Sequence, residues 1–255
     1  MKQPLQQALA GVGGAALWLL PTVAAAQAKN PATTDDLLTR PVALVVALAL
    51  VAILPFAFMT VTAFVKISTV LQIVRGAIGA QGVPSNTVVM ALAGALTLLA
   101  MAPVGSRIAD RAEPLWKGEV VEDTPMLVAG VVKATVEPLR DFMRANASTR
   151  EKARFFELAK AARPEAERDR VGDSDLVVLI PSFMVTELLE AFTLGFALYL
   201  PFLVIDLVVG NVLLSLGMQM MNPTQVSLPF KLLLFVAIDG WGLLAQALVT
   251  GYATS

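Results

Sequence analysis

The sequence has no cysteine and no histidine, and only 15% of its 255 residues are charged. Without cysteine there are no disulfides, thiol nucleophiles or thiolate zinc ligands, and without histidine the usual proton shuttle at neutral pH is missing. Most enzyme classes are therefore disfavoured, and we expect no cofactor and no metal site. The net charge of −1 gives no basic field, so we expect no nucleic-acid partner either.

Apolar side chains dominate the composition, at 56% of residues. Uncharged stretches run over residues 41–65 and 76–106. Each is longer than the roughly 20 residues that an α-helix needs to cross a bilayer. The sequence therefore predicts an all-α membrane protein built from helical hairpins, with the first hydrophobic hairpin at residues 41–106.

The first residues resemble a secretory signal. Lys2 precedes an apolar stretch at residues 8–20, and the small-residue sequence AAAQA follows. A basic start, a hydrophobic centre and an A-x-A-like exit are the parts of a signal peptide. We predict a signal peptide at residues 1–26 and a linker at 27–40, with an uncleaved membrane helix as the alternative to the signal peptide.

The segment between the two uncharged stretches has the periodicity of an amphipathic helix. Its apolar face consists of Ile67, Val70, Leu71, Ile73, Val74, Ala77 and Ile78. Lys66 projects within this face, so it must reach a helix end or find a carboxylate. Residues that end a helix or cap the next one follow directly, namely Gly79, Gly82, Pro84, and Ser85 or Asn86.

Charge is concentrated in residues 107–175, which hold 27 of the 39 charged side chains. This segment is expected in water. Residues 128–143 and 149–162 have helical composition, with Ser148 or Thr149 before Glu151 as a start signal. Residues 164–175 are predicted to be a mobile loop.

Topology follows from the signal peptide, whose cleavage leaves residue 41 entering the membrane from outside. The short connection with Lys66 and Arg75 then lies in the cytoplasm, as the positive-inside rule expects. The segment at residues 107–175 is consequently extracytoplasmic, and periplasmic in a Gram-negative cell. A second hydrophobic hairpin, residues 176–255, returns its turn to the inner side.

This second hairpin carries isolated charges within apolar runs. Glu187 and Glu190 are three residues apart and share a helix face, so they share protons or take basic partners. If straight helices turn at Pro223, Asp206 lies level with Gly240 and near Asp239, and Lys231 lies level with Ser215. On this geometry Lys231 has no acid at its own level, because Asp239 is about 12 Å away along the helix.

We therefore expect Asp206, Lys231 and Asp239 to take partners from another hairpin or subunit, as ion pairs that fix assembly. An ion-conducting acid is the alternative. Asp206, Gly210, Leu213 and Gly217 also share a helix stripe whose glycines permit close approach of a neighbouring backbone. Both observations predict an oligomer.

Three methionines, Met218, Met220 and Met221, lie in the turn of this hairpin. Thioether side chains are flexible and apolar, and they pack against irregular or changing partners. A ring of such turns would seal a pore and yield to a passing chain. A buried hairpin tip is the alternative interpretation.

Several segments closely resemble the SctR/FliP family of type III secretion export proteins. They are FVKISTVLQIVRGAIGAQGVPSN, FMVTELLEAFTLGFALYLPFLVID and LGMQMMNPTQVSLPFKLLLFVAIDGW. The resemblance covers nearly all of residues 42–250. The FVKI start and the GAQGVPSN segment are more similar to the injectisome branch, known as YscR or HrcR, than to the flagellar branch.

The resemblance implies a non-enzymatic export-gate subunit of the bacterial inner membrane that conducts unfolded substrates. Family members form a pentamer with SctS/FliQ-like and SctT/FliR-like subunits in a helical pore, beside SctU/FlhB-like and SctV/FlhA-like proteins. It also implies that Met218, Met220 and Met221 form a gasket around the closed pore, in which Gln219 interrupts the more usual methionine run.

Two other classes of protein remain possible from the residues alone. An ion-conducting stator or channel subunit would also place carboxylates such as Asp206 in membrane helices. A membrane enzyme would need an acid–base constellation, for which Glu187 and Glu190 are the candidates.

Overall fold

The computed structural model describes residues 34–80, 82–117 and 124–252, and all regular elements in these residues are helical. The predicted all-α class is confirmed. The predicted signal peptide lies outside the described residues. Helix α1 (Thr34–Val61) begins within the predicted linker, residues 27–40. The sequence TDDL, a capping residue type followed by two acids, favours a helix start there.

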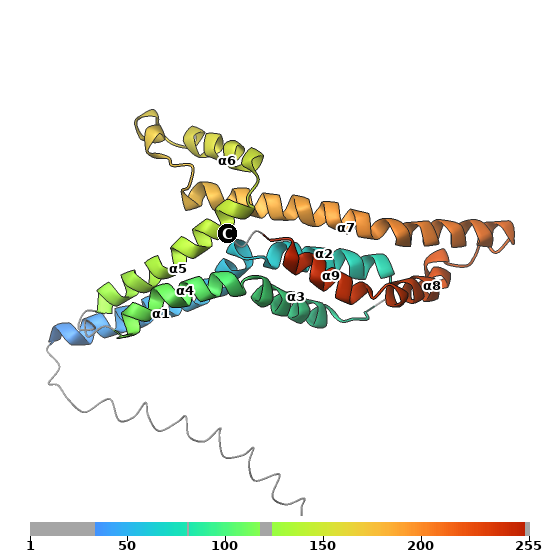
Figure 1. Ribbon diagram of the computed structural model, residues 1–255, viewed down its shortest axis with the longest axis horizontal. Helices are drawn as coiled ribbons and strands as arrows, with labels where there is room; N and C mark the ends of the chain where they lie inside the picture. Colours follow the sequence, from blue (N-terminus) through green and yellow to red (C-terminus); the bar gives the residue numbers. More distant parts are fainter. Residues whose placement is uncertain (1–33, 81, 118–123, 253–255) are drawn as a thin grey trace, which may run out of the picture. The chain divides into compact units, whose positions relative to one another are not determined.

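The chain divides into two compact units, residues 1–53 and 54–255, and every contact described below lies within the second. Helix α2 (Phe64–Ile78) lies between α7 (Leu176–Ser215) and α3 (Asn86–Ala100), and packs against both (Figure 1). Six of the seven residues of the predicted apolar face are buried. The seventh, Ile73, is half-buried against α7, where a Cβ at Gly195 would collide with it. The predicted amphipathic helix is therefore confirmed.

Short-range signals at the helix ends are also confirmed. Helix α2 ends at Gly79, which has a left-handed φ of 75° that favours glycine. The side chain of Ser85 accepts a hydrogen bond from the Val88 amide and caps α3. Ser148 caps α6 (Thr149–Ala161) in the same way by accepting from the Glu151 amide.

Three helix pairs are bent, and one of them lies in the hairpin arm after Pro223 that the sequence geometry took as straight. Residues 51–61 meet α2 at 68°, α3 meets α4 (Ala102–Lys117) at 57°, and α8 (Pro223–Ala237) meets α9 (Gly240–Thr250) at 58°. Pro103 directly follows the second bend and has no amide proton for the helix. At the third bend Asp239 adopts a left-handed φ of 52°.

These bends change how the helices match a membrane. Among the described residues only α7 is long and apolar enough to cross a bilayer by itself, and the number rises to four if each bent pair counts as one span. The multi-pass pattern expected from two uncharged stretches therefore depends on broken spans rather than on straight helices.

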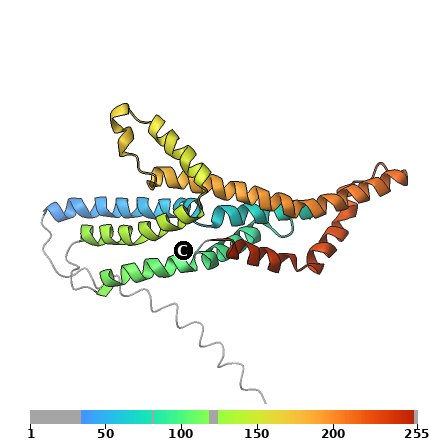
Figure 2. The ribbon, with the colours of Figure 1, turned by 45° about the horizontal axis from the view of Figure 1, so that its top comes forward.

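The charged central segment forms the greater part of α4, then α5 (Thr124–Asn146), α6 and a 3₁₀ helix at Glu165–Arg170. Both predicted helices are confirmed, whereas part of the predicted loop at residues 164–175 is helical. The start of α6 lies beside α7 (Figure 2). Two hydrogen bonds join the helices there: the Ser148 amide donates to the Thr186 hydroxyl at 3.1 Å, and the Ser182 hydroxyl donates to the Glu151 carbonyl at 3.3 Å. The extracytoplasmic position of this segment stays a prediction.

The core lies where α2, α3, α5 and α7 meet. Its largest buried apolar side chains include Phe142, Phe183, Ile67, Leu71 and Met143. Phe142 contacts both Phe183 and Tyr252, with ring centroids 5.6 and 5.7 Å apart. Tyr252 is itself buried, so the chain two residues after the end of α9 belongs to the core.

Candidate functional site

Lys66 of α2 lies between two carboxylates of α7. Its Nζ atom is 3.3 Å from Glu187 Oε1 and 2.8 Å from Glu190 Oε2. The side chains of Lys66 and Glu187 are 4% and 0% exposed, whereas that of Glu190 is 49% exposed. Lys66 thus has the carboxylate that its position required, and the two glutamates take a basic partner, so both of these sequence expectations are confirmed.

Tyr252 completes this cluster, and no signal in the sequence indicated it. Its ring centroid lies 4.0 Å from Lys66 Nζ, a favourable cation–π distance. Its hydroxyl lies within hydrogen-bonding distance of Glu187 Oε2 and of the Ala63 carbonyl, the latter at 3.2 Å. Burial and the neighbouring Glu187 carboxylate raise the pKa of Tyr252 above its ordinary value, so the phenol stays protonated and donates.

A second ion pair joins α7 to α8. Lys231 Nζ lies 2.6 Å from Asp206 Oδ2 and 3.1 Å from the Ala77 carbonyl, and the Ser227 hydroxyl donates to Asp206. Lys231 is buried, and the side chain of Asp206 is 25% exposed. The expectation that these two charges lack an intrachain partner is wrong.

The error lies in the position of the turn. Helix α7 ends at Ser215 and α8 begins at Pro223, so the middle of the turn falls near residue 219 rather than at Pro223. Moving the turn by about four residues moves the opposite arm by about eight, which is ~12 Å of helix rise. This displacement brings Lys231 level with Asp206.

Asp239 differs from the other predicted assembly charges. It is exposed at the bend between α8 and α9, and it makes no ion pair or side-chain hydrogen bond with any residue in the described ranges. For this residue the expectation of a partner outside the chain stays a prediction.

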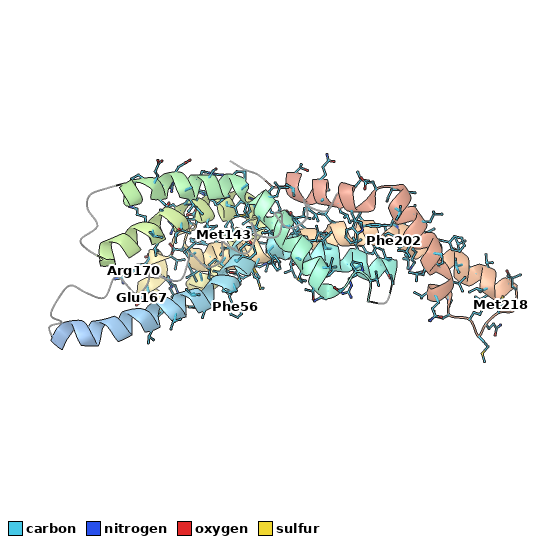
Figure 3. The ribbon with its side chains drawn as sticks, turned by 90° about the horizontal axis from the view of Figure 1, so that it is seen from below. Phe56, Met143, Glu167, Arg170, Phe202 and Met218 are labelled. Carbon is cyan, nitrogen blue, oxygen red and sulfur yellow. The ribbon has the colours of Figure 1, made fainter. Side chains whose placement is uncertain are left out.

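The methionine turn, residues 216–222, projects at the far end of α7 and α8, where Figure 3 labels Met218. Met220 is fully exposed, and Met218 and Met221 are more than two-fifths exposed. Gly217 has a φ of 75°, and the Asn222 side chain caps α8 by accepting from the Thr224 amide. The chain itself therefore does not bury this tip.

An apolar groove separates the two helices near that turn. It has a volume of about 480 Å³ and is lined by valines of α7 and by Val226 and Phe230 of α8. Within residues 34–80, 82–117 and 124–252, no group of three or more acidic side chains could hold a metal ion. The hairpin end thus presents apolar and thioether surface.

Comparison with known proteins identifies the family. The FliP family model matches residues 47–248. This chain belongs to the FliP family. Members similar to it include the hypersensitivity response secretion protein HrcR of Ralstonia nicotianae, with 41% identity over 213 residues that cover 82% of this chain and 96% of the relative.

Further FliP-family relatives have names that refer to translocation and to flagellar biosynthesis. Yop proteins translocation protein R of Yersinia pestis is 40% identical over 82% of this chain and 95% of its own length. The flagellar biosynthetic protein FliP of Caulobacter vibrioides is 38% identical over 92% of this chain and 86% of its own length. The range that the FliP family model matches, residues 47–248, includes the Lys66 and Lys231 ion pairs and the methionine turn.

Proposed function

We propose that this chain is a core subunit of a type III secretion export gate and forms the entry pore for unfolded proteins crossing the bacterial inner membrane. The match of the FliP family to residues 47–248 carries the proposal. The relatives with secretion and translocation names support it, since they align along more than nine-tenths of their own length.

The methionine turn is the part of the chain suited to close such a pore. Its three thioether side chains extend from the hairpin end without being packed against their own chain. Several copies around an axis would bring these flexible apolar side chains together and exclude water and ions. Gln219 adds one polar side chain to each turn and makes the seal looser than an unbroken run of methionines.

The finer parts of the proposal concern assembly. Five copies form a helical pore with SctS/FliQ-like and SctT/FliR-like subunits, next to SctU/FlhB-like and SctV/FlhA-like proteins. Residues 107–175 lie on the periplasmic side, and the system is an injectisome. The extensive apolar surface of α7 supports an assembled state, because large exposed apolar patches mark interfaces.

The ion pairs of the carboxylates argue against the two other classes of protein, an ion-conducting subunit and a membrane enzyme. Asp206 is paired with Lys231, so it is not the isolated membrane carboxylate that an ion-conducting subunit would use. Glu187 and Glu190 are both bound by Lys66, which makes them poor candidates for an acid–base pair.

Native mass spectrometry of the full chain, co-expressed with the small hydrophobic proteins encoded beside it, tests the proposal. We expect a complex with five copies of this chain and several copies of the small partners. A chain that remains monomeric, or binds none of those partners, would contradict the proposed function.

A further inference from the structure

The apolar parts of the second unit, residues 54–106 and 176–252, contain only seven charged side chains. Five of them form the two ion-pair clusters, Lys66 with Glu187 and Glu190, and Lys231 with Asp206. The two that remain are Arg75 and Asp239. Neither makes an ion pair with a described residue, and their charges are opposite.

Arg75 lies in the last turn of α2, on the face opposite to the buried one. It borders a hollow of about 320 Å³ together with Gln72, Gly76, Gly79 and Ala80. No atom lies within 4 Å of the position that a Cβ on Gly76 would occupy. The hollow therefore has room for an incoming backbone and side chain next to a half-buried guanidinium.

Asp239 is exposed on an apolar surface, whereas Arg75 borders a hollow. Exposed apolar side chains surround it in the sequence, including Val236, Ile238 and Leu243. When a partner covers these side chains, the carboxylate loses water and requires a cation, because an unpaired buried charge is costly. Asp239 has left-handed backbone at the bend between α8 and α9, and its carboxylate lies over Gly242 in the first turn of α9.

Two contacts place Arg75 and Asp239 at similar levels along α2. Lys231 contacts the Ala77 carbonyl near the end of α2, and Tyr252 contacts the Ala63 carbonyl just before its start. The chain from residue 231 to residue 252 therefore runs antiparallel to α2. Arg75 and Asp239 both fall between these two contacts in sequence. Figures 1 and 2 show α9 over the same horizontal extent as α2.

We propose that Arg75 of one copy binds Asp239 of the next copy, so that the acidic bend of one chain enters the hollow beside Arg75 of its neighbour. Side chains at the same level meet when copies are related by rotation about an axis parallel to α2. Such a head-to-tail contact uses each charge once per chain and repeats from one copy to the next. This inference rests on the proposed function, which requires several copies.

The cysteine-free chain allows a direct cross-linking test. Arg75→Cys is placed in a copy with one affinity tag, and Asp239→Cys in a copy with another tag. The two copies are co-expressed, and membranes isolated from these cells are oxidised. We expect a disulfide-linked dimer that carries both tags. The matched control pairs Arg75→Cys with Thr250→Cys, about 16 Å further along α9, and should give no such dimer.

A charge exchange tests the ion pair without cross-linking. Asp239→Asn tolerates the left-handed backbone and removes only the charge. It and Arg75→Asp should each weaken co-purification of differently tagged copies about tenfold. The double variant Arg75→Asp with Asp239→Arg should recover most of that loss.

The outcomes separate this inference from the proposed function. Tagged copies that co-purify but give no mixed dimer would overturn the Arg75–Asp239 contact and leave the export-gate subunit standing. A disulfide found only within a chain that carries both cysteines would also overturn it. Failure of the unmodified tagged copies to co-purify would overturn both.

Discussion

The two halves of α7 differ in what covers them. In the first half, residues 176–195, eight residues are buried by neighbouring helices, among them Phe183, Glu187 and Gly195. In the second half, residues 196–215, only Phe202 and Leu213 are buried. One continuous helix thus belongs to the folded core at one end and presents apolar surface at the other.

The ion pairs follow the same division. The Lys66–Glu187 pair is fully inside the core and is closed by Tyr252, whereas the Lys231–Asp206 pair fixes a two-helix arm and leaves Asp206 partly in water. This difference indicates that the core folds on contacts within the chain, and under the proposed function other copies would complete the arm. The predictions below test this division, in decreasing order of their effect on unfolding.

Lys66→Met should have the largest effect on stability. It leaves Glu187 buried without a cation, which costs about 3–5 kcal/mol. We expect little folded protein, or a strongly reduced free energy of unfolding in detergent by denaturant titration. Glu190→Gln is the matched control and should be nearly neutral, because that carboxylate is half in water. A loss for Lys66→Met as small as that for Glu190→Gln would contradict the burial of the cluster.

Lys231→Met should destabilise the arm more than the core. Because Asp206 is partly hydrated, we expect a loss of about 1–3 kcal/mol. Limited proteolysis should cut the turn at residues 216–222 faster, while the region around Phe142 and Phe183 remains protected. Uniform loss of protection would show that arm and core unfold as one unit, against the division described above.

Tyr252→Phe removes one hydroxyl and keeps the ring over Lys66. Because Lys66 still binds Glu187, the loss of this one hydrogen bond predicts a decrease in the free energy of unfolding of about 0.5–1.5 kcal/mol. Thermal unfolding measures it, with Tyr199→Phe as the matched variant on α7. A Tyr252 variant as stable as the Tyr199 variant would remove the hydroxyl from the cluster.

Joint replacement of Met218, Met220 and Met221 by alanine should have the smallest effect on stability. Because these side chains are exposed, the free energy of unfolding should change by less than about 0.5 kcal/mol. The assembled complex should nevertheless conduct small ions in planar bilayers. Met59→Ala, an exposed methionine outside the turn, should not. Unchanged conductance of the triple variant would remove the gasket role.

The sequence predicted what depends on neighbours along the chain. The buried face of α2, its glycine end and the serine caps of α3 and α6 each follow from spacings of a few residues. The need of Lys66 for a carboxylate followed in the same way, because a lysine on an apolar helix face has few alternatives.

The remaining features depend on distant parts of the chain. Lys66 and Glu187 are 121 residues apart, and Tyr252 contacts Ala63 across 189 residues. No local spacing encodes such pairs. The pairing of Lys231 with Asp206 was not predicted because it depends on the position of the methionine turn. The bend at Asp239 was not predicted because left-handed backbone is uncommon outside glycine.

Tyr252 has a consequence for the order of synthesis. A ribosome makes Lys66, then Glu187, and only much later the tyrosine that contacts both. During that interval the lysine and glutamate have neither the aromatic ring nor the phenol. The core of this protein therefore cannot reach its final packing while translation is still in progress upstream of residue 252.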